Sequence, residues 1–330
     1  MQNDTLGFYG KLPVSSEFLR WNASSAEIEE LDRWIREGMY YAKTSLSSSW
    51  PMDFAQTDPW NFLFVPREGL RFIVGALIPS QDKAGREFPF LIYHLLGKLE
   101  YSPALWCAPL RFRRFFTQCH DAIKEIANAS DISKVEDRVR SLGWSAMPDD
   151  ESGEKLYRAL LLGKESRELW ASLFGDFEHP DKYRLFAEVI ECLDAFRQGG
   201  GPETSYSVKV PLLPSCREET YDLPFWVDLI TRAAGKEREV RMLLWSRRPS
   251  KGKPLLLVAM GLPSPHLMLL LVHPERIEEQ SCVPAPRGSA GDACHPTTLN
   301  VEGRALLDDG NLSLEAFLNR STVLGMSHQA

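Results

Sequence analysis

The strongest hydrophobic pattern in the chain lies between residues 70 and 96. Two apolar segments, 70–79 and 88–96, flank a polar loop at residues 80–87. The first segment is almost continuously apolar, which is typical of a strand that is covered on both faces. The loop contains four charged residues and one glycine: Asp82, Lys83, Arg86, Glu87 and Gly85. The pattern therefore predicts a buried β-hairpin with a charged tip.

The elements on either side of this hairpin follow from the spacing of apolar residues. Before it, we expect strands near residues 7–13 and 60–65 and a helix that begins at about Ser25, where Ser24 and Glu27 have the spacing of a capping box. After it, apolar residues recur every three or four positions. This spacing predicts helices at 112–126, 130–142, 155–174 and 182–198. Beyond a glycine-rich linker at 199–202, we expect strands at 206–212, 240–245 and 255–260 and helices at 223–234 and 264–271.

Strands at both ends of the chain with helices between them predict one α/β layered domain over residues 1–275. Within it, residues 6–100 form the first half of the sheet, 101–200 an inserted helical segment, and 204–275 returning strands and helices. A separate C-terminal domain is the competing interpretation. Residues 276–330 are rich in Pro, Ser, Gly and Ala, and we expect a peripheral extension, partly ordered at best, with one short helix near 313–318.

Composition narrows the class of partner. The net charge of −7 argues against nucleic acid or an anionic membrane as the main partner. The apolar stretches are interrupted well short of a membrane span, so no membrane insertion is expected. The first seven residues lack the pattern of a signal peptide. The six cysteines have no framework spacing, which indicates reduced thiols. We therefore expect a cytoplasmic protein.

The polar loop is also the best candidate for chemistry. Ser80, Asp82 and Lys83 contain the residue types of a Ser–Lys nucleophile pair, although no glycine cluster for an oxyanion hole accompanies them. The alternative is structural. In that interpretation Asp82 and Arg86 hold the loop by hydrogen bonds, and Gly85 supplies a conformation that other residues resist.

Other groups of reactive or ligating side chains give weaker evidence for a functional site. Three such groups occur: Cys282, Cys294, His295 and His273 as candidate metal ligands; Cys119 with His120 as a candidate thiol–imidazole pair; and Arg111, Arg113 and Arg114 as candidate phosphate contacts. The first set has no zinc-site spacing. Cys119 lies on the apolar stripe of a predicted helix, where packing in the core is expected. The three arginines fall on the face of the same helix opposite its phenylalanines, as on a solvated surface. No catalytic residue, metal or cofactor is predicted.

The order of the N-terminal motifs is more specific. The chain reads G-F-Y-G-K-L-P at residues 7–13, P-W-N-F at 59–62 and P-S-Q-D-K-A-G-R-E-F-P at 79–89. It closely resembles the TagF (ImpM) family of type VI secretion-associated proteins over about residues 6–97. A weaker similarity covers about 222–272, around Phe225-Trp226 and Leu244-Trp245. Two departures stand out: Ser16-Glu17 where the family usually has Gly-Asp, and Asn61 where Arg is common.

The resemblance implies a three-layer α/β sandwich, for which we expect a mixed, largely antiparallel central sheet. It also implies a non-enzymatic, post-translational repressor of type VI secretion that binds the Fha-type scaffold protein in the cytoplasm, with other secretion components as further candidate partners. The alternative is a hydrolase or phosphoryl-handling enzyme built on Ser80, Asp82 and Lys83. The candidates for partner binding or for clamping the loop are Ser80, Asp82, Lys83, Arg86, Glu17 and Lys11.

Overall fold

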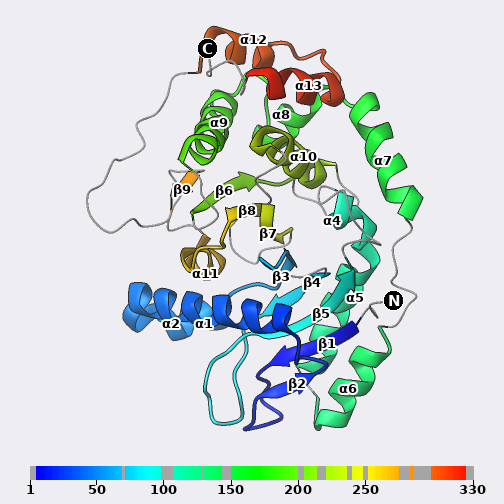
Figure 1. The fold of residues 1–330 in the computed structure, drawn as a ribbon, viewed down its shortest axis with the longest axis vertical. Helices are drawn as coiled ribbons and strands as arrows, with labels where there is room; N and C mark the ends of the chain where they lie inside the picture. Colours follow the sequence, from blue (N-terminus) through cyan, green and yellow to red (C-terminus); the bar gives the residue numbers. More distant parts are fainter. Residues whose placement is uncertain are drawn as a thin grey trace.

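A single antiparallel sheet of nine described strands forms the centre of the molecule (Figure 1). The computed structural model describes residues 5–68, 71–97, 107–127, 129–142, 150–199, 204–213, 221–235, 240–247, 252–274, 282–284 and 299–324. The strand order is β2-β1-β5-β4-β3-β7-β8-β6-β9. The strands are β1 Thr5–Gly10, β2 Leu19–Trp21, β3 Trp60–Phe64, β4 Arg71–Ile78, β5 Phe90–Gly97, β6 Ser205–Pro211, β7 Val240–Ser246, β8 Leu255–Gly261 and β9 Cys282–Pro284.

The pairing of β3 with β7 joins the two halves of the chain. Asn61 pairs with Trp245 and Phe64 with Met242 in this contact, so the later strands continue the sheet begun by the earlier ones. Each of the eight pairings among the described strands is antiparallel. The α/β class is therefore confirmed, whereas the expectation of a mixed sheet was wrong for the described strands.

The predicted hairpin is formed by β4 and β5, which pair from Arg71 with Gly97 to Ile78 with Phe90. Successive side chains enter opposite faces of the sheet, as the two-residue period of a strand requires. In β4, Val74 belongs to one hydrophobic core and Ile73 to the other. Both faces of the hairpin are covered, which explains its nearly continuous apolar sequence.

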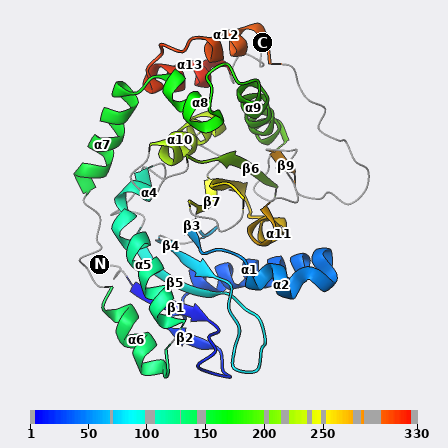
Figure 2. The same ribbon diagram turned by 180° about the vertical axis from the view of Figure 1, so that it is seen from behind.

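Helices cover the two faces and complete three layers (Figures 1 and 2). One face carries α1 Ala26–Leu46, the 3-10 turn η1 Ser47–Ser49, α2 Trp50–Ala55 and α11 His266–Val272. The other carries α4 Ala108–Arg111, α5 Arg113–Ile126, α6 Ile132–Arg140, α7 Asp150–Gly163, α8 Ser166–Phe174, α9 Asp181–Gly199, α10 Asp222–Ala234, α12 Val301–Asp308 and α13 Leu314–Leu324. The helical segment predicted at 155–174 corresponds to two helices, α7 and α8, which are separated by a break after Gly163.

The start of α1 agrees with the prediction in position and differs in mechanism. The helix begins at Ala26, and Ser25, the residue before it, makes no side-chain capping bond. The Glu27 carboxylate accepts two hydrogen bonds from Arg71, at 2.9 and 2.8 Å. The predicted capping box of Ser24 and Glu27 was therefore wrong, because the carboxylate pairs with the first residue of β4 instead.

The expectation of a peripheral C-terminal extension was also wrong for its described residues. The short strand β9 pairs with β6 at the edge of the sheet. In α13, Phe317 is fully buried, and its ring contacts Trp170, Phe186 and Phe225 with centroids 5.7–6.0 Å apart. A helix that contributes such a ring to the main core is an integral part of the fold. The boundaries of the predicted 1–275 domain stay a prediction.

Among the described residues, no helix combines the length and the apolar composition needed to cross a membrane.

Candidate functional site

The loop between β4 and β5 is organised around the buried carboxylate of Asp82. Its Oδ1 accepts hydrogen bonds from the backbone N–H groups of Ala84 and Arg86, both at 2.9 Å. Its Oδ2 accepts a hydrogen bond from the Arg86 guanidinium at 2.7 Å and lies 3.1 Å from the Lys11 ammonium. An Asp side chain that bonds to the backbone of its own turn in this way fixes the turn.

The same residues attach the loop to the segment that follows β1. Arg86 donates a second hydrogen bond, at 2.6 Å, to the backbone carbonyl of Ser16. Lys83 donates its backbone N–H to the carbonyl of Ser15 at 2.9 Å, and Lys11 reaches the carbonyl of Arg86 at 3.3 Å. We call Lys11, Ser15, Ser16, Asp82 and Arg86 the clamp. The clamp holds two loops together that are distant in the sequence.

The electrostatics of the clamp favour an ionised Asp82. Burial opposes the charge, but the hydrogen bonds from the Arg86 backbone, Lys11 and the Arg86 side chain outweigh it and lower the pKa of the Asp82 carboxyl to about 2. A carboxylate with such a low pKa is a weak general base near neutral pH, where the most efficient base has a pKa close to the pH of the reaction.

The tip of the loop is exposed. Gly85 has φ +79°, and a Cβ at that position would meet nothing within 4 Å. Glycine is therefore favoured at this position because of the backbone conformation and not because a side chain would lack space. Lys83 and Ala84 are exposed as well, and the Lys83 ammonium makes no hydrogen bond or ion pair with a described residue. The clamp therefore presents a rigid tip with one uncompensated cation.

Glu87 fastens the end of the loop to the helical layer. Its Oε2 accepts a hydrogen bond from the indole of Trp50 at 2.6 Å and lies 2.9 Å from the Lys43 ammonium. The hairpin tip is thus held from two directions, by the clamp and by this pair of contacts with α1 and α2.

The structure separates the predicted site residues into two groups. Asp82, Arg86 and Lys11 meet in the clamp, whereas Lys83 and Glu17 are exposed. Ser80 is half-buried, and its backbone carbonyl accepts a hydrogen bond from Phe88 N–H. Within the described residues, no hydrogen bond joins Ser80 to Lys83. The clamp interpretation of Asp82 and Arg86 therefore agrees with the geometry, while the nucleophile pair has no observed contact to support it.

Sequence reasoning missed a group of aromatic rings beside the clamp. Tyr9, Phe18 and Phe88 contact one another, with ring centroids 4.6 Å apart for Tyr9–Phe18 and 4.8 Å for Phe18–Phe88. Two guanidiniums lie against these rings: Arg20 at 5.3 Å from the Phe18 centroid and Arg36 at 5.5 Å from the Phe88 centroid. We call these five residues the aromatic platform. Its sequence signal is the alternation of Phe18 and Arg20, which places both on one side of an extended segment.

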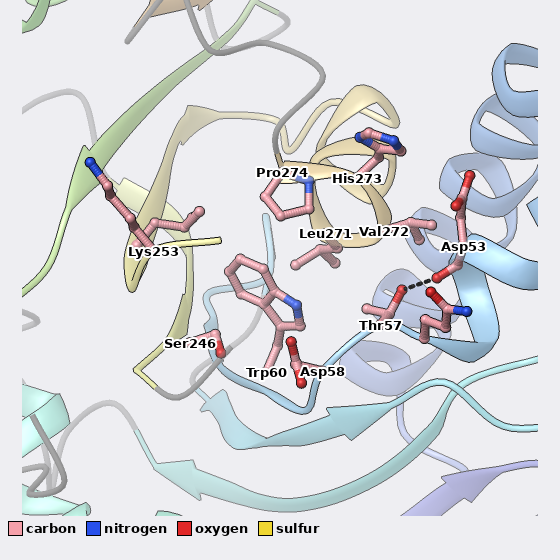
Figure 3. Close-up of a pocket in the computed structure, with 12 residues that line it drawn as sticks. Asp53, Thr57, Asp58, Trp60, Ser246, Lys253, Leu271, Val272, His273 and Pro274 are labelled. Carbon is pink, nitrogen blue, oxygen red and sulfur yellow. Dashed lines mark hydrogen bonds between the residues drawn. The ribbon is translucent and has the colours of Figure 1, made fainter. Parts of the chain in front are cut away.

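A pocket of about 160 Å³ lies at the start of β3, around the Trp60 indole (Figure 3). Ser246 and Asp58 lie beside the ring, and His273 lies on the α11 side. The hydrogen bond drawn there joins the Thr57 hydroxyl to the backbone carbonyl of Asp53, at 2.9 Å. Typical ligand sites are about 300–1,000 Å³, so this pocket is small. It does not include the clamp.

A second pocket, of about 590 Å³, lies between α1 and the loop that follows β8. Its charged lining residues are Glu29, Glu30, Glu37, Glu68, Arg33 and Arg67. Neither this pocket nor the first is lined by Ser80, Asp82 or Lys83.

Two further residues from the sequence analysis, Asn61 and Cys119, are buried in the protein interior. Asn61 is buried, and its side-chain oxygen lies 2.8 Å from His120 Nε2. Cys119 is buried in the core, and this burial raises the pKa of its thiol. Cys294, His295 and the side chain of Cys282 lie outside the described residues. The described residues contain no cluster of three His, Cys, Asp or Glu side chains suited to a metal.

Comparison with known proteins gives a match to a family model over residues that include the clamp. Residues 7–142 match the family model of the TagF N-terminal domain, described as type VI secretion system-associated. Among solved structures, the chain is similar to the crystal structure of PA0076 from Pseudomonas aeruginosa PAO1, with 18% sequence identity and a TM-score of 0.47. That similarity covers 87% of this chain and 100% of the other. No curated protein sequence matches the chain.

Proposed function

From the match of residues 7–142 to the TagF N-terminal domain, we propose that the chain is a non-enzymatic repressor of a type VI secretion system. In this proposal it acts in the cytoplasm by binding an Fha-type scaffold protein of the secretion apparatus. Binding removes the scaffold from assembly, and no bond of the partner is made or broken.

The observation that carries the proposal is that the Asp82 carboxylate binds groups of the protein itself. Both of its carboxylate oxygens are engaged within the protein, by two backbone N–H groups and two cationic side chains. These contacts engage the carboxylate in fixing the loop and make the neighbouring surface rigid. Rigid, exposed loops are common binding elements because little conformational entropy is lost when they bind.

The proposed contact surface is the loop tip together with the exposed part of the segment after β1. Lys83 and Arg86 are exposed on the first, and Ser16 and Glu17 on the second. The clamp brings these two segments side by side. Because Ser16 and Glu17 replace the Gly-Asp that is usual in the family, this surface is also where the protein would adapt to its own partner.

Calorimetric titration of the full chain with the Fha-like protein encoded beside it tests the proposal. The full chain is needed, because α13 contributes to the core and its removal would expose apolar surface. We expect binding in the micromolar range or tighter, about −8 kcal/mol or better. Lys83→Glu should weaken it, whereas Arg114→Glu, a charge reversal at an exposed site on α5, should not. Absence of binding by the unmodified chain would refute the choice of partner.

A secretion assay provides the second test of this proposal. Overproduction of the chain should lower secretion by the type VI system, and the Lys83→Glu variant should lower it less at the same protein level. Unchanged secretion in the presence of the unmodified chain would contradict the repressor role even if the scaffold binds.

A further inference from the structure

We propose that the aromatic platform, together with Lys83, is a docking surface for a carboxylate-rich segment of a partner protein. This inference rests on the proposed function only in that the occupant is a protein. It names the chemistry of the contact and does not depend on which secretion component supplies it.

The first observation is the state of Arg20. Its side chain is exposed, and its guanidinium makes no hydrogen bond or ion pair with a described residue. Its contacts are with rings: the guanidinium carbon lies 5.4 Å from the Tyr9 centroid and 5.3 Å from the Phe18 centroid. Contact with these rings holds the guanidinium without using its N–H groups. A planar guanidinium of this kind can bind a carboxylate through two parallel hydrogen bonds.

The second observation is the position of the rings. Phe18 is half-buried and is the ring of the platform that reaches solvent, because Tyr9 and Phe88 are buried. Two guanidiniums contact it, with Arg20 at 5.3 Å and Arg36 at 5.8 Å from its centroid. Arg36 is itself held by Asp32, at 2.8 Å, and by the Tyr9 hydroxyl, at 3.3 Å. The platform therefore has little freedom to rearrange. Aromatic rings combined with arginine are the usual composition of binding hot spots.

Charge complementarity decides the nature of the occupant. The protein as a whole carries a net charge of −7, yet the clamp places two cations, Lys11 and Arg86, against one carboxylate, and Arg20 and Lys83 lack any partner among the described residues. Together with the exposed carboxylate of Glu17 and with Asp32 beside Arg36, this surface has five cations (Lys11, Arg20, Arg36, Lys83 and Arg86) and three carboxylates (Glu17, Asp32 and Asp82), so it has a cationic excess on an acidic protein. Such a region attracts an acidic segment and disfavours association with another copy of the same acidic chain.

Nucleic acid is the competing occupant, and the geometry favours it less. Affinity for nucleic acid comes mainly from many cationic contacts along the phosphate backbone. Here only Arg20 and Lys83 are without a partner, since Arg36 is paired with Asp32 and Lys43 with Glu87. Two available cations beside a small hydrophobic area suit a short acidic peptide better than a long polyanion.

The test uses a fluorescein-labelled decaglutamate peptide and the full chain, followed by fluorescence anisotropy at about 50 mM salt, where screening is weak. We expect saturable binding. Arg20→Glu and Lys83→Glu should each weaken it by about tenfold or more, a free-energy change of about 1.4 kcal/mol. Arg114→Glu makes the same change in net charge at a remote exposed position and should leave binding within about twofold. Circular dichroism and thermal melting confirm that each variant is folded.

A further variant separates stacking from charge. Arg20→Lys keeps the cation but loses the planar group, so it should recover only part of the affinity lost in Arg20→Glu. Equal binding by Arg20→Glu and Arg114→Glu would overturn the inference. So would the lack of any peptide binding at about 1 mM, or tighter binding of a labelled single-stranded oligonucleotide of equal length.

The peptide experiment does not contain the scaffold protein, so the two proposals can fail separately. Peptide binding that depends on Arg20, with no binding of the scaffold, would refute the proposed partner and leave the docking surface standing. Scaffold binding that is unchanged in Arg20→Glu, with no peptide binding, would refute the docking surface and leave the proposed function standing.

Discussion

The Lys11 ammonium lies 3.1 Å from Oδ2 of Asp82 and joins the segment after β1 to the loop after β4. Both ends of this pair are shielded, since the Lys11 side chain is 15% exposed and that of Asp82 is fully buried. The contact is therefore screened less than a surface ion pair. It makes the fold of the first strand and the shape of the hairpin tip depend on each other.

Replacing Asp82 should destabilise the protein. In Asp82→Asn, one acceptor oxygen becomes an NH₂ donor that faces the donors of Lys11 and Arg86, so both cations lose an acceptor at a buried position. We expect a clearly lower urea midpoint. Glu17→Gln is the matched control, because Glu17 is an exposed carboxylate without a hydrogen bond or ion pair through its side chain. An equal effect of the two substitutions would contradict the clamp.

The contribution of Asp82 should also depend on pH in a defined direction. The folded state lowers the pKa of this carboxyl from 3.8 to about 2. A lowered pKa gives stability that is fully present above the ordinary value and is lost as the pH falls toward the folded value. The difference in unfolding midpoint between the unmodified chain and Asp82→Asn should therefore be constant at pH 5 and above and narrow between about pH 4 and pH 2. A difference that widens over this range would contradict the assignment.

Two glycines of the N-terminal motifs should respond differently to alanine. Gly85 has φ +79° with open space around it, so Gly85→Ala should cost only the backbone strain, about 1–2 kcal/mol. Gly10 has φ +131°, and a Cβ there would lie 2.8 Å from Phe90 Cα and closer still to the Pro89 carbonyl. Gly10→Ala should therefore disrupt the β1–β5 pairing. Urea unfolding of the first variant and the soluble yield of the second provide the measurement.

The local elements were predictable, because apolar spacing and breaker residues determine them. The hairpin at 70–96, the helix from about Ser25 and the strands near 206–212 and 240–245 are all present, with ends shifted by one or two residues. The pairing of β3 with β7 was not predictable in register, since no local pattern specifies which distant strand Trp60–Phe64 meets. Long-range pairing is decided by the packing of the whole core.

The sequence identified candidate residues of the site but not all of the contacts between them. A clamp made by Asp82 and Arg86 was one of the interpretations that the loop residues allowed, with Lys11 among the candidates. The structure brings Lys11 to Asp82 and adds the carbonyl of Ser16 as a distant partner of Arg86. Arg20 was missed because an arginine in a short strand has no distinctive pattern. The burial of Phe317 was missed because a short helix after a Pro- and Gly-rich stretch resembles a peripheral segment, and only its tertiary contacts show otherwise.

The C-terminal helix should be required for stability. Phe317→Ala removes a fully buried ring from contact with Trp170, Phe186 and Phe225, so we expect a loss of about 3–5 kcal/mol in the free energy of unfolding. Val301→Ala is the matched control on α12, because Val301 is 83% exposed and its truncation should have little effect. A small effect of Phe317→Ala would restore the interpretation of this segment as peripheral.

The buried ion pair of Asp222 and Arg247 joins the start of helix α10 to the residue after β7, and the two residues should be energetically coupled. Arg247 donates to both carboxylate oxygens, at 3.3 and 3.1 Å, and both side chains are at most 2% exposed. Asp222 also accepts the backbone N–H of Leu213 at 2.6 Å. Removal of one member leaves a buried charge without its partner. Arg247→Met should therefore cost about 3–5 kcal/mol in the free energy of unfolding.

A double-mutant cycle distinguishes the ion pair from simple loss of packing. Asp222→Asn keeps an oxygen for the Leu213 N–H but removes the charge, so it should also destabilise the unmodified background. In the Arg247→Met background, the same change removes an unpaired buried carboxylate, and its cost should shrink or reverse sign. Urea unfolding of the four proteins gives the coupling energy. If the two costs simply add, Asp222 and Arg247 act independently, and the contact between α10 and β7 depends on the surrounding apolar side chains alone.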